Sequence, residues 1–271
     1  MRSMDAARTQ TTFSVLAASG ALVLGLFLSP SAPEAKTLRT TVAPHGITAA
    51  EILEASLVAR GGRTQIAKTT NLEWYGSVKV TESGITGRFE SFAAMPHRER
   101  FKLLWDGDFY TMDVDGDSVS ETFPSGTHEV VGSERDQEIL DANFDYDLRW
   151  QELFPTVKLN GIVNFEGKKA YSIEMVAAHT GLVRTRYIDA ESYLPLGEDR
   201  DIVISERGRN YSTETNGRDH FLVRMVYSDY RTVAGVKYAF HWVRLATGHP
   251  NLPEMVYQTD RVESNTAMAW K

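Results

Sequence analysis

The residues best spaced for chemistry lie in the stretch DVDGDS, where aspartates occupy every second position from Asp113. Carboxylates at this spacing occur in calcium-binding loops, which also need Gly at the sixth position and Glu at the twelfth. Counting from Asp113, those positions hold Ser118 and Pro124. The calcium motif is therefore incomplete, and the Asp115-Gly116 pair instead predicts the tip of a β-hairpin.

Other signatures of catalysis or metal binding are weak in this sequence. The chain has 7 histidines, none of them paired at the i, i+4 spacing of a metalloprotease helix, and it has no cysteine. The lack of cysteine excludes disulfides, thiol nucleophiles, zinc–thiolate sites and iron–sulfur clusters. The acidic pairs Glu138/Asp141 and Asp145/Asp147 fall on a predicted helix and are interpreted as its solvated side. We therefore expect no cofactor, no metal ion and no enzymatic activity.

Composition bounds the class of protein. The chain has 271 residues, of which 42% are hydrophobic, and a formal net charge of −7 at pH 7. This hydrophobic content is enough for a packed core and is not that of a disordered chain. A net negative charge disfavours a surface that binds polyanions, so nucleic acid is not an expected partner.

The N-terminal residues follow the order of a secretory signal. Arg2 and Arg8 come first, a 17-residue uncharged run from Phe13 to Ser29 follows, and the small residues of PSAPEAK come last. The run is at the short limit for a membrane span, about 17–25 residues, so retention as an anchor is the alternative to cleavage. The predicted organisation is a signal peptide or uncleaved anchor, a linker and one folded domain: residues 1–35, 36–47 and 48–271.

The body of the chain changes from helical to strand periodicity. Thr48 and Glu51 have the spacing of a capping box and Gly61-Gly62 is a stop signal, so a helix is predicted between them. From Asn71 onwards apolar residues recur at every second position between turn signals, which is typical of antiparallel strands. The stretch from Ser133 to Pro155 has apolar residues at helical spacing and predicts a second helix. These elements predict a mainly β, α+β fold built on a strongly curved antiparallel sheet.

Several stretches resemble the outer-membrane lipoprotein-sorting (lipoprotein carrier, LolA-like) family. They are the helix AAEILEASLVARGG, the strands NLEWYGSVKV, the corner Met95-Pro96-His97-Arg98, the strand pair KLNGIVNFEGKKAYSIEMV, the hairpin TRYIDAESYLPL and the segment YSDYRTVAGVKYAFHW. The resemblance runs from about Thr48 to Asn265 and includes no catalytic signature. It implies an incomplete barrel whose two helices act as a lid over an apolar concavity, in a periplasmic protein.

The resemblance further implies a carrier that holds acyl chains of a lipid or lipoprotein non-covalently in an apolar cleft. Release of water from apolar surface, worth about 25 cal/mol per Å², would drive such binding. The best-studied carriers of the family have an arginine just before the corner proline, where it latches the lid, and this chain has Met95 there. This departure disfavours dedicated lipoprotein sorting and leaves general lipid binding or sensing open. The side chains expected to line the cleft are Ile52, Leu57, Trp74, Val78, Phe101, Leu103, Trp105, Tyr110, Met112, Tyr171, Ile173, Tyr238, Phe240 and Trp242.

The alternative function is that of a structural or signalling module. In that case the same half-barrel docks a membrane-associated protein partner, and its interior is packed shut. Retention of the N-terminal apolar run as an anchor would favour this alternative. In both cases we expect a monomer.

Overall fold

The computed structural model describes residues 46–205, 218–247 and 253–267. The predicted signal peptide or anchor and nearly all of the predicted linker lie outside the described residues.

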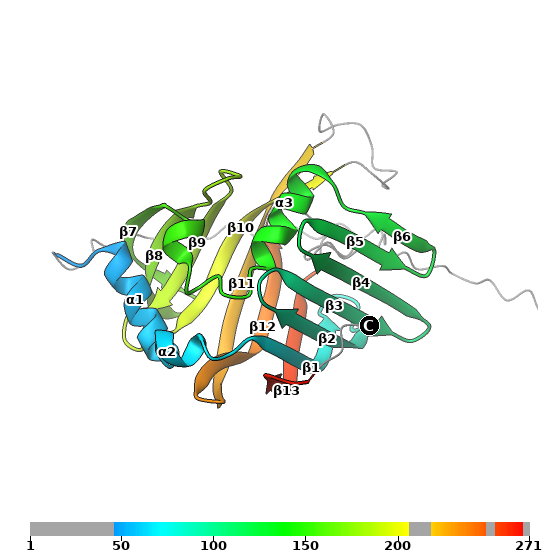
Figure 1. Cartoon of the computed structure of the whole chain (residues 1–271), viewed down its shortest axis with the longest axis horizontal. Helices are drawn as coiled ribbons and strands as arrows, with labels where there is room; N and C mark the ends of the chain where they lie inside the picture. The colour runs from blue at the N-terminus through cyan, green and yellow to red at the C-terminus, as the bar shows by residue number, and fades with distance from the viewer. Residues whose placement is uncertain (1–45, 206–217, 248–252, 268–271) are drawn as a thin grey trace, which may run out of the picture.

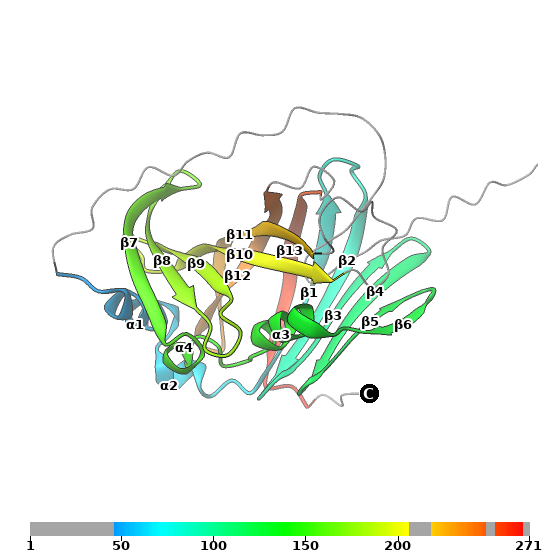
Figure 2. The ribbon, with the colours of Figure 1, turned by 90° about the horizontal axis from the view of Figure 1, so that it is seen from above.

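The described strands form one 13-stranded antiparallel sheet that curves strongly and does not close (Figures 1 and 2). The strand order is β6-β5-β4-β3-β2-β1-β13-β12-β11-β10-β9-β8-β7. Two meanders, β1–β6 and β7–β13, are thus joined where the last strand pairs with the first, with Leu72 opposite Ser264. The predicted fold class, a curved antiparallel sheet forming an incomplete barrel, is confirmed.

The first meander consists of β1 (Asn71–Val80), β2 (Thr86–Ala94), β3 (Arg98–Trp105), β4 (Asp108–Asp115), β5 (Ser118–Phe123) and β6 (Gly126–Glu129). The second consists of β7 (Thr156–Phe165), β8 (Lys168–Val176), β9 (Val183–Asp189), β10 (Pro195–Ser205), β11 (Arg218–Val233), β12 (Val236–Thr247) and β13 (Met255–Ser264).

The first predicted helix is α1 (Ala49–Arg60), and a one-turn helix, α2 (Arg63–Ile66), follows it. Thr48 and Glu51 form the predicted capping box, which satisfies backbone N–H groups at the start of α1. Gly61 ends α1 with φ 132°, and a Cβ there would lie 2.4 Å from the carbonyl oxygen of Gly235, so only glycine fits. Within the described ranges, no helix has both the length and the apolar character needed to span a bilayer.

The predicted second helix over residues 133–155 is wrong as a single element. The structure has α3 (Gly132–Asp141) and α4 (Trp150–Leu153), with a non-helical lid segment, residues 142–149, between them. Asn143 ends α3, because its side-chain Nδ2 donates to the carbonyl oxygens of Ile139 and Leu140 at 3.0 and 3.4 Å. Asparagine that bonds nearby backbone in this way competes with helix continuation.

Both predicted hairpin tips are confirmed. The stretch TRYIDAESYLPL turns between β9 and β10, where Asp189 Oδ1 accepts from the backbone N–H groups of Glu191 and Ser192 at 2.9 and 2.8 Å. In DVDGDS the chain turns at residues 116–117, between β4 and β5. The aspartates before that turn, Asp113 and Asp115, form cross-strand ion pairs with arginines of β3.

Hydrophobic clusters occupy the concave side of the sheet, where Figure 2 shows α3. The first cluster packs β1–β5 and β13 against the end of α3 and is formed by Val78, Val80, Phe89, Leu103, Tyr110, Met112, Val114, Val119, Val130, Ala142, Met255 and Tyr257. The second packs α1 and α4 on β8 and β9 and is formed by Ala49, Ile52, Leu53, Leu57, Leu140, Trp150, Phe154, Tyr171, Ile173, Met175, Ala177 and Ile188. The region between these clusters holds the candidate site.

Asn143 allows a test of how α3 ends. Asn143→Ala should destabilise the fold by about 1–3 kcal/mol, because it removes the donor to two carbonyl groups in a buried setting. The measurement is urea unfolding. The matched control is Asn164→Ala, whose side chain accepts one bond from Gly167 in an exposed turn and should lose less stability. Equal effects of the two variants would contradict this account of the helix end.

Candidate ligand-binding cavity

A cavity of about 470 Å³ lies between the concave face of the sheet and the lid segment. Its walls come from β1–β3, β9–β13, α1 and the end of α3, and its lining includes Phe144, Tyr146 and Leu148 of the lid segment. Sites for small ligands usually enclose about 300–1,000 Å³. The space is therefore large enough for a small ligand.

One side of the cavity is an aromatic wall, formed by Trp74, Phe89, Phe101, Trp242 and Tyr257. The rings of Trp242 and Tyr257, which lie opposite each other on β12 and β13, stack with centroids 3.7 Å apart. Phe89 meets both rings edge-on, at 5.6 and 5.5 Å. Rings that hold one another in this way present a broad apolar surface of fixed shape.

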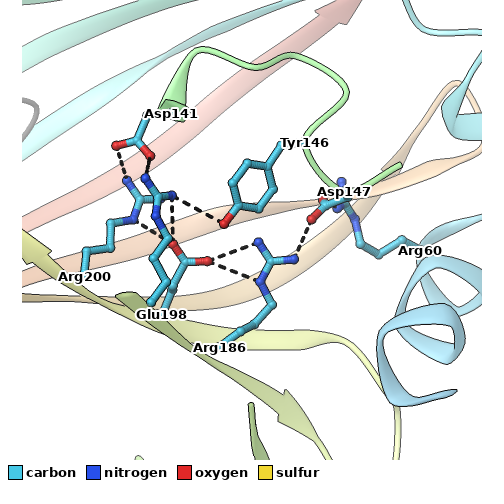
Figure 3. Close-up of polar contacts among 8 residues, drawn as sticks. Arg60, Asp141, Tyr146, Asp147, Arg186, Glu198 and Arg200 are labelled. Carbon is cyan, nitrogen blue, oxygen red and sulfur yellow. Dashed lines mark hydrogen bonds and ion pairs between the residues drawn. The ribbon is translucent and has the colours of Figure 1, made fainter. Parts of the chain in front are cut away.

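The opposite side carries a charge network, defined by Arg60, Asp141, Asp147, Arg184, Arg186, Glu198 and Arg200 (Figure 3). Its centre is Glu198 of β10, whose Oε2 accepts from Arg186 Nη2 at 3.1 Å. Glu198 Oε1 accepts from Arg200 Nε at 2.9 Å and from Arg184 Nη1 at 3.3 Å. Glu198 thus brings together three arginines from β9 and β10.

Two aspartates attach the other elements to these arginines. Asp141, the last residue of α3, pairs with Arg184 and accepts from Arg200 Nη1 at 2.9 Å. Asp147, in the lid segment, accepts from Arg186 Nη1 at 2.6 Å and also pairs with Arg60 of α1. The network therefore fixes α3, the lid segment and α1 to the sheet.

Tyr146 adds a neutral contact beside these pairs. Its hydroxyl accepts from Arg184 Nη1 at 3.4 Å, and its ring lies 4.9 Å from the guanidinium carbon of Arg186. The lid segment is therefore held by an aromatic–cation contact as well as by charge.

Arginines outnumber carboxylates in the network, and this excess of positive charge lowers the pKa of the carboxylates. Burial alone would raise the pKa of Glu198, but Arg200, Arg186 and Arg184 lower it to about 2. Asp147 behaves in the same way, because Arg60 and Arg186 outweigh burial and lower its pKa to about 2. Both carboxylates are therefore ionised at neutral pH.

Glu99, which lines the cavity from β3, shows the opposite behaviour. Burial and the neighbouring charge of Asp141 raise the pKa of Glu99 to about 7, against an opposing effect of Arg200. Near neutral pH this carboxyl group is therefore partly protonated, and its charge changes within the cavity.

The structure brings five of the predicted cleft residues to the cavity: Trp74, Phe101, Leu103, Tyr238 and Trp242. The other nine do not line it. Val78, Tyr110 and Met112 belong to the first hydrophobic cluster, with Trp105 packed against it. Ile52, Leu57, Tyr171 and Ile173 belong to the second cluster, and Phe240 packs with Leu72 and Val236.

Sequence reasoning missed the charge network. The interpretation of Glu138/Asp141 and Asp145/Asp147 as a solvated helix side is wrong, because Glu138 is 3% exposed and Asp141 and Asp147 point to arginines of the sheet. One signal was present in RTRYI: Arg184, Arg186 and Ile188 share a strand face. Arginines that alternate in phase with an inward isoleucine indicate an inward charged face.

No known protein family matches the chain by sequence, and no curated protein does either. Solved structures do match. A LolA superfamily protein from Nitrosomonas europaea is 10% identical, with a TM-score of 0.50 over 82% of this chain and 96% of that one. A DUF1329 family protein from Desulfovibrio piger is 11% identical, with a TM-score of 0.50 over 80% and 93%. An outer membrane lipoprotein-sorting protein domain from Vibrio parahaemolyticus is 12% identical, with a TM-score of 0.48 over 81% and 93%.

At these identities the comparisons define the fold alone. The open, curved sheet with helices on its concave side is a LolA-like fold. The resemblance noted in the sequence is confirmed at this level.

Glu198 allows a test of the charge network. Glu198→Gln should destabilise the protein by about 3–5 kcal/mol, because it leaves buried guanidinium groups short of one counter-charge. The pKa of Glu198 is lowered from 4.5 to about 2. The destabilisation of Glu198→Gln relative to wild type should therefore be largest above about pH 4.5 and should shrink as the pH falls toward 2. Urea unfolding across this range is the measurement. The control Asp229→Asn, in an exposed pair with Arg231, should change stability little; an equal effect would contradict the buried-network account.

Glu99 provides a pH test of opposite sign. Because the pKa of Glu99 is raised from 4.5 to about 7, the contribution of this group to stability should fall as the pH rises between these values. The melting temperature of Glu99→Gln should therefore rise relative to that of wild type as the pH is raised from 4.5 to 8. Glu152→Gln is the control: Arg149 lowers the pKa of Glu152 below 4.5, so this group is ionised in the folded and the unfolded state over most of the range and its difference from wild type should stay nearly constant. A flat difference between Glu99→Gln and wild type would refute the raised pKa.

Proposed function

We propose that this protein binds an acyl chain non-covalently in the cavity under the lid segment, and carries or presents it without chemical change. The observation that carries the proposal is the cavity of about 470 Å³ between the aromatic wall and the lid segment. A module that only docks partners through a closed interior would pack this space, since protein interiors are normally filled to crystal-like density. The open space favours the carrier over the docking module.

The chemistry of the lining supports an amphipathic ligand. The aromatic wall offers apolar surface, and burial of a chain there gains about 25 cal/mol per Å². The lid segment contributes Phe144 and Leu148 to the same space, so a bound chain would be covered on both sides. The charge network lies opposite the wall and is already internally paired, which leaves the wall as the surface for the chain.

Lid movement is part of the proposal. The lid segment is attached to the sheet through Asp147 and Tyr146, and water can solvate both partners of an ion pair when it separates. An apolar roof would lose more on opening, because it exposes apolar surface. The lid segment also packs Phe144 and Leu148 on hydrophobic clusters, so both kinds of contact open when a chain enters or leaves.

Two further expectations from the sequence belong to this proposal. Residues 1–35 act as a secretory signal or anchor, and residues 48–271 fold as one domain that works in the periplasm as a monomer. The LolA-like fold supports this assignment, as does the order of charged, apolar and small residues at the N-terminus.

The proposal is tested by filling the cavity from a small side chain. Ser91 lines the cavity between Trp74 and Phe101, its partners on β1 and β3. Ser91→Trp should abolish binding of a fluorescent fatty acid, because the indole occupies the space, while wild type binds the probe at one site. Arg88→Trp, at an exposed position on the opposite face of β2, should bind like wild type.

Folding of each variant is checked by thermal unfolding, and Ala93→Trp, also in the cavity lining, replaces Ser91→Trp if that variant does not fold. Absence of probe binding by wild type, or unchanged binding by the cavity variants, would reject the acyl-chain proposal.

A further inference from the structure

Arg244 of β12 is a buried cation that lacks a counter-charge in the described part of the chain. Its side chain lines the cavity and the residue is 4% exposed. Its Nη1 donates to the thioether sulfur of Met255 at 3.1 Å. Its Nε and Nη2 are buried and have no hydrogen-bond partner. No carboxylate of the described residues pairs with it, in contrast to the arginines of the charge network.

The surroundings of Arg244 are two methionines and the phenol of Tyr257, with no charged partner among the described residues. Across the sheet it lies opposite Met225 of β11 and Met255 of β13, and both methionines are buried. Burial lowers the pKa of Arg244, and the neighbouring Tyr257 and Tyr110 oppose this effect only in part. For Arg184, by contrast, Asp141, Tyr146 and Glu198 together outweigh burial and raise the pKa. Arg244 therefore carries its charge in a setting that does not compensate it.

An uncompensated buried guanidinium is unfavourable, and a thioether is a weak acceptor that offsets little of this. Such a group is stabilised when an anion supplies oxygen acceptors. A guanidinium presents a planar fork that matches a carboxylate or a phosphate with two parallel hydrogen bonds. The flanking methionines are flexible side chains that repack readily, so an oxyanion can take the place now held by the Met255 sulfur.

We infer that Arg244 binds the anionic head group, a carboxylate or a phosphate monoester, of the acyl ligand whose chain lies along the aromatic wall. This inference rests on the proposed function and specifies its ligand class. The wall residues Trp242 and Tyr257 lie next to Arg244 on the cavity face, two positions before it on β12 and two positions after its partner Met255 on β13. Head and chain sites are thus adjacent. An acyl chain in a neutral ester or amide lacks the charge that this site requires.

The test compares three ligands with the same sixteen-carbon chain: hexadecanoic acid, hexadecyl phosphate and hexadecanol. Each displaces the neutral hydrophobic dye N-phenyl-1-naphthylamine from the purified protein at neutral pH. Wild type should bind the acid or the phosphate at least about tenfold more tightly than the alcohol, the effect expected of hydrogen bonds to a charged group. The tighter of the two anions identifies the head group as carboxylate or phosphate.

The variant Arg244→Met removes the charge and keeps a flexible apolar side chain. It should bind the alcohol as wild type does, lose the preference for the anions, and melt no lower than wild type because the unpaired charge is gone. Arg88→Met, at an exposed position outside the cavity, is the matched control and should keep the preference. If Arg244→Met does not fold, Arg244→Gln, which keeps hydrogen-bond donors without the charge, takes its place in the same comparison.

The outcomes separate this inference from the proposed function. Equal binding of acid, phosphate and alcohol by wild type, or an unchanged preference in Arg244→Met, would overturn the role of Arg244 while leaving acyl-chain binding in place. Failure of all three ligands to displace the dye would overturn the proposed function and this inference together.

Discussion

The pairing of four arginines with three carboxylates between sheet and lid segment determines the architecture of the cavity. Arg60, Arg184, Arg186 and Arg200 come from α1, β9 and β10, and each carboxylate is shared by at least two of them. Buried charges are tolerated only when they are paired and well bonded. Because the pairs are directional, they fix α3, the lid segment and α1 at set positions over the sheet.

This constraint explains why a cavity persists in a chain with so many large apolar residues. On either side of the network, hydrophobic clusters pack densely and join helices to strands. Non-directional apolar contacts would draw the lid segment onto the aromatic wall and fill the space. The charge network fixes Asp141 and Asp147 to arginines of the sheet, and the aromatic wall lines open space beside it.

The placement of charge also distinguishes two uses of buried arginine in one protein. The arginines of the network are satisfied by Asp141, Asp147 and Glu198 and have a structural role. Arg244 lies beside the aromatic wall with two nitrogen atoms unpartnered. In our proposal, the arginines of the charge network hold the lid segment, whereas Arg244 finds hydrogen-bond acceptors for its free nitrogen atoms only when a ligand is bound. The lid segment is attached at two places: the backbone N–H of Phe144 donates to the carbonyl oxygen of the corner residue Pro96 at 3.3 Å, and Asp147 pairs with Arg186 of β9.

The sequence by itself determined the features that depend on neighbouring residues. Alternation of apolar residues specified antiparallel strands, the Thr48–Glu51 spacing specified the start of α1, and Asp-Gly and Asp-Ala-Glu-Ser specified hairpin tips. Five predicted cleft residues line the cavity, but Ile173 and Met112, with the same alternation, are packed core. Alternating apolar residues show which side chains share a face of a strand, but not whether other elements pack on that face or leave it open to a cavity. The tertiary structure alone decided that Asp141 and Asp147 face the sheet and not the solvent, because they meet arginines about 40 to 60 residues further along the chain. Long-range charge pairing of this kind leaves no local periodicity, since its partners are brought together only when the sheet has formed.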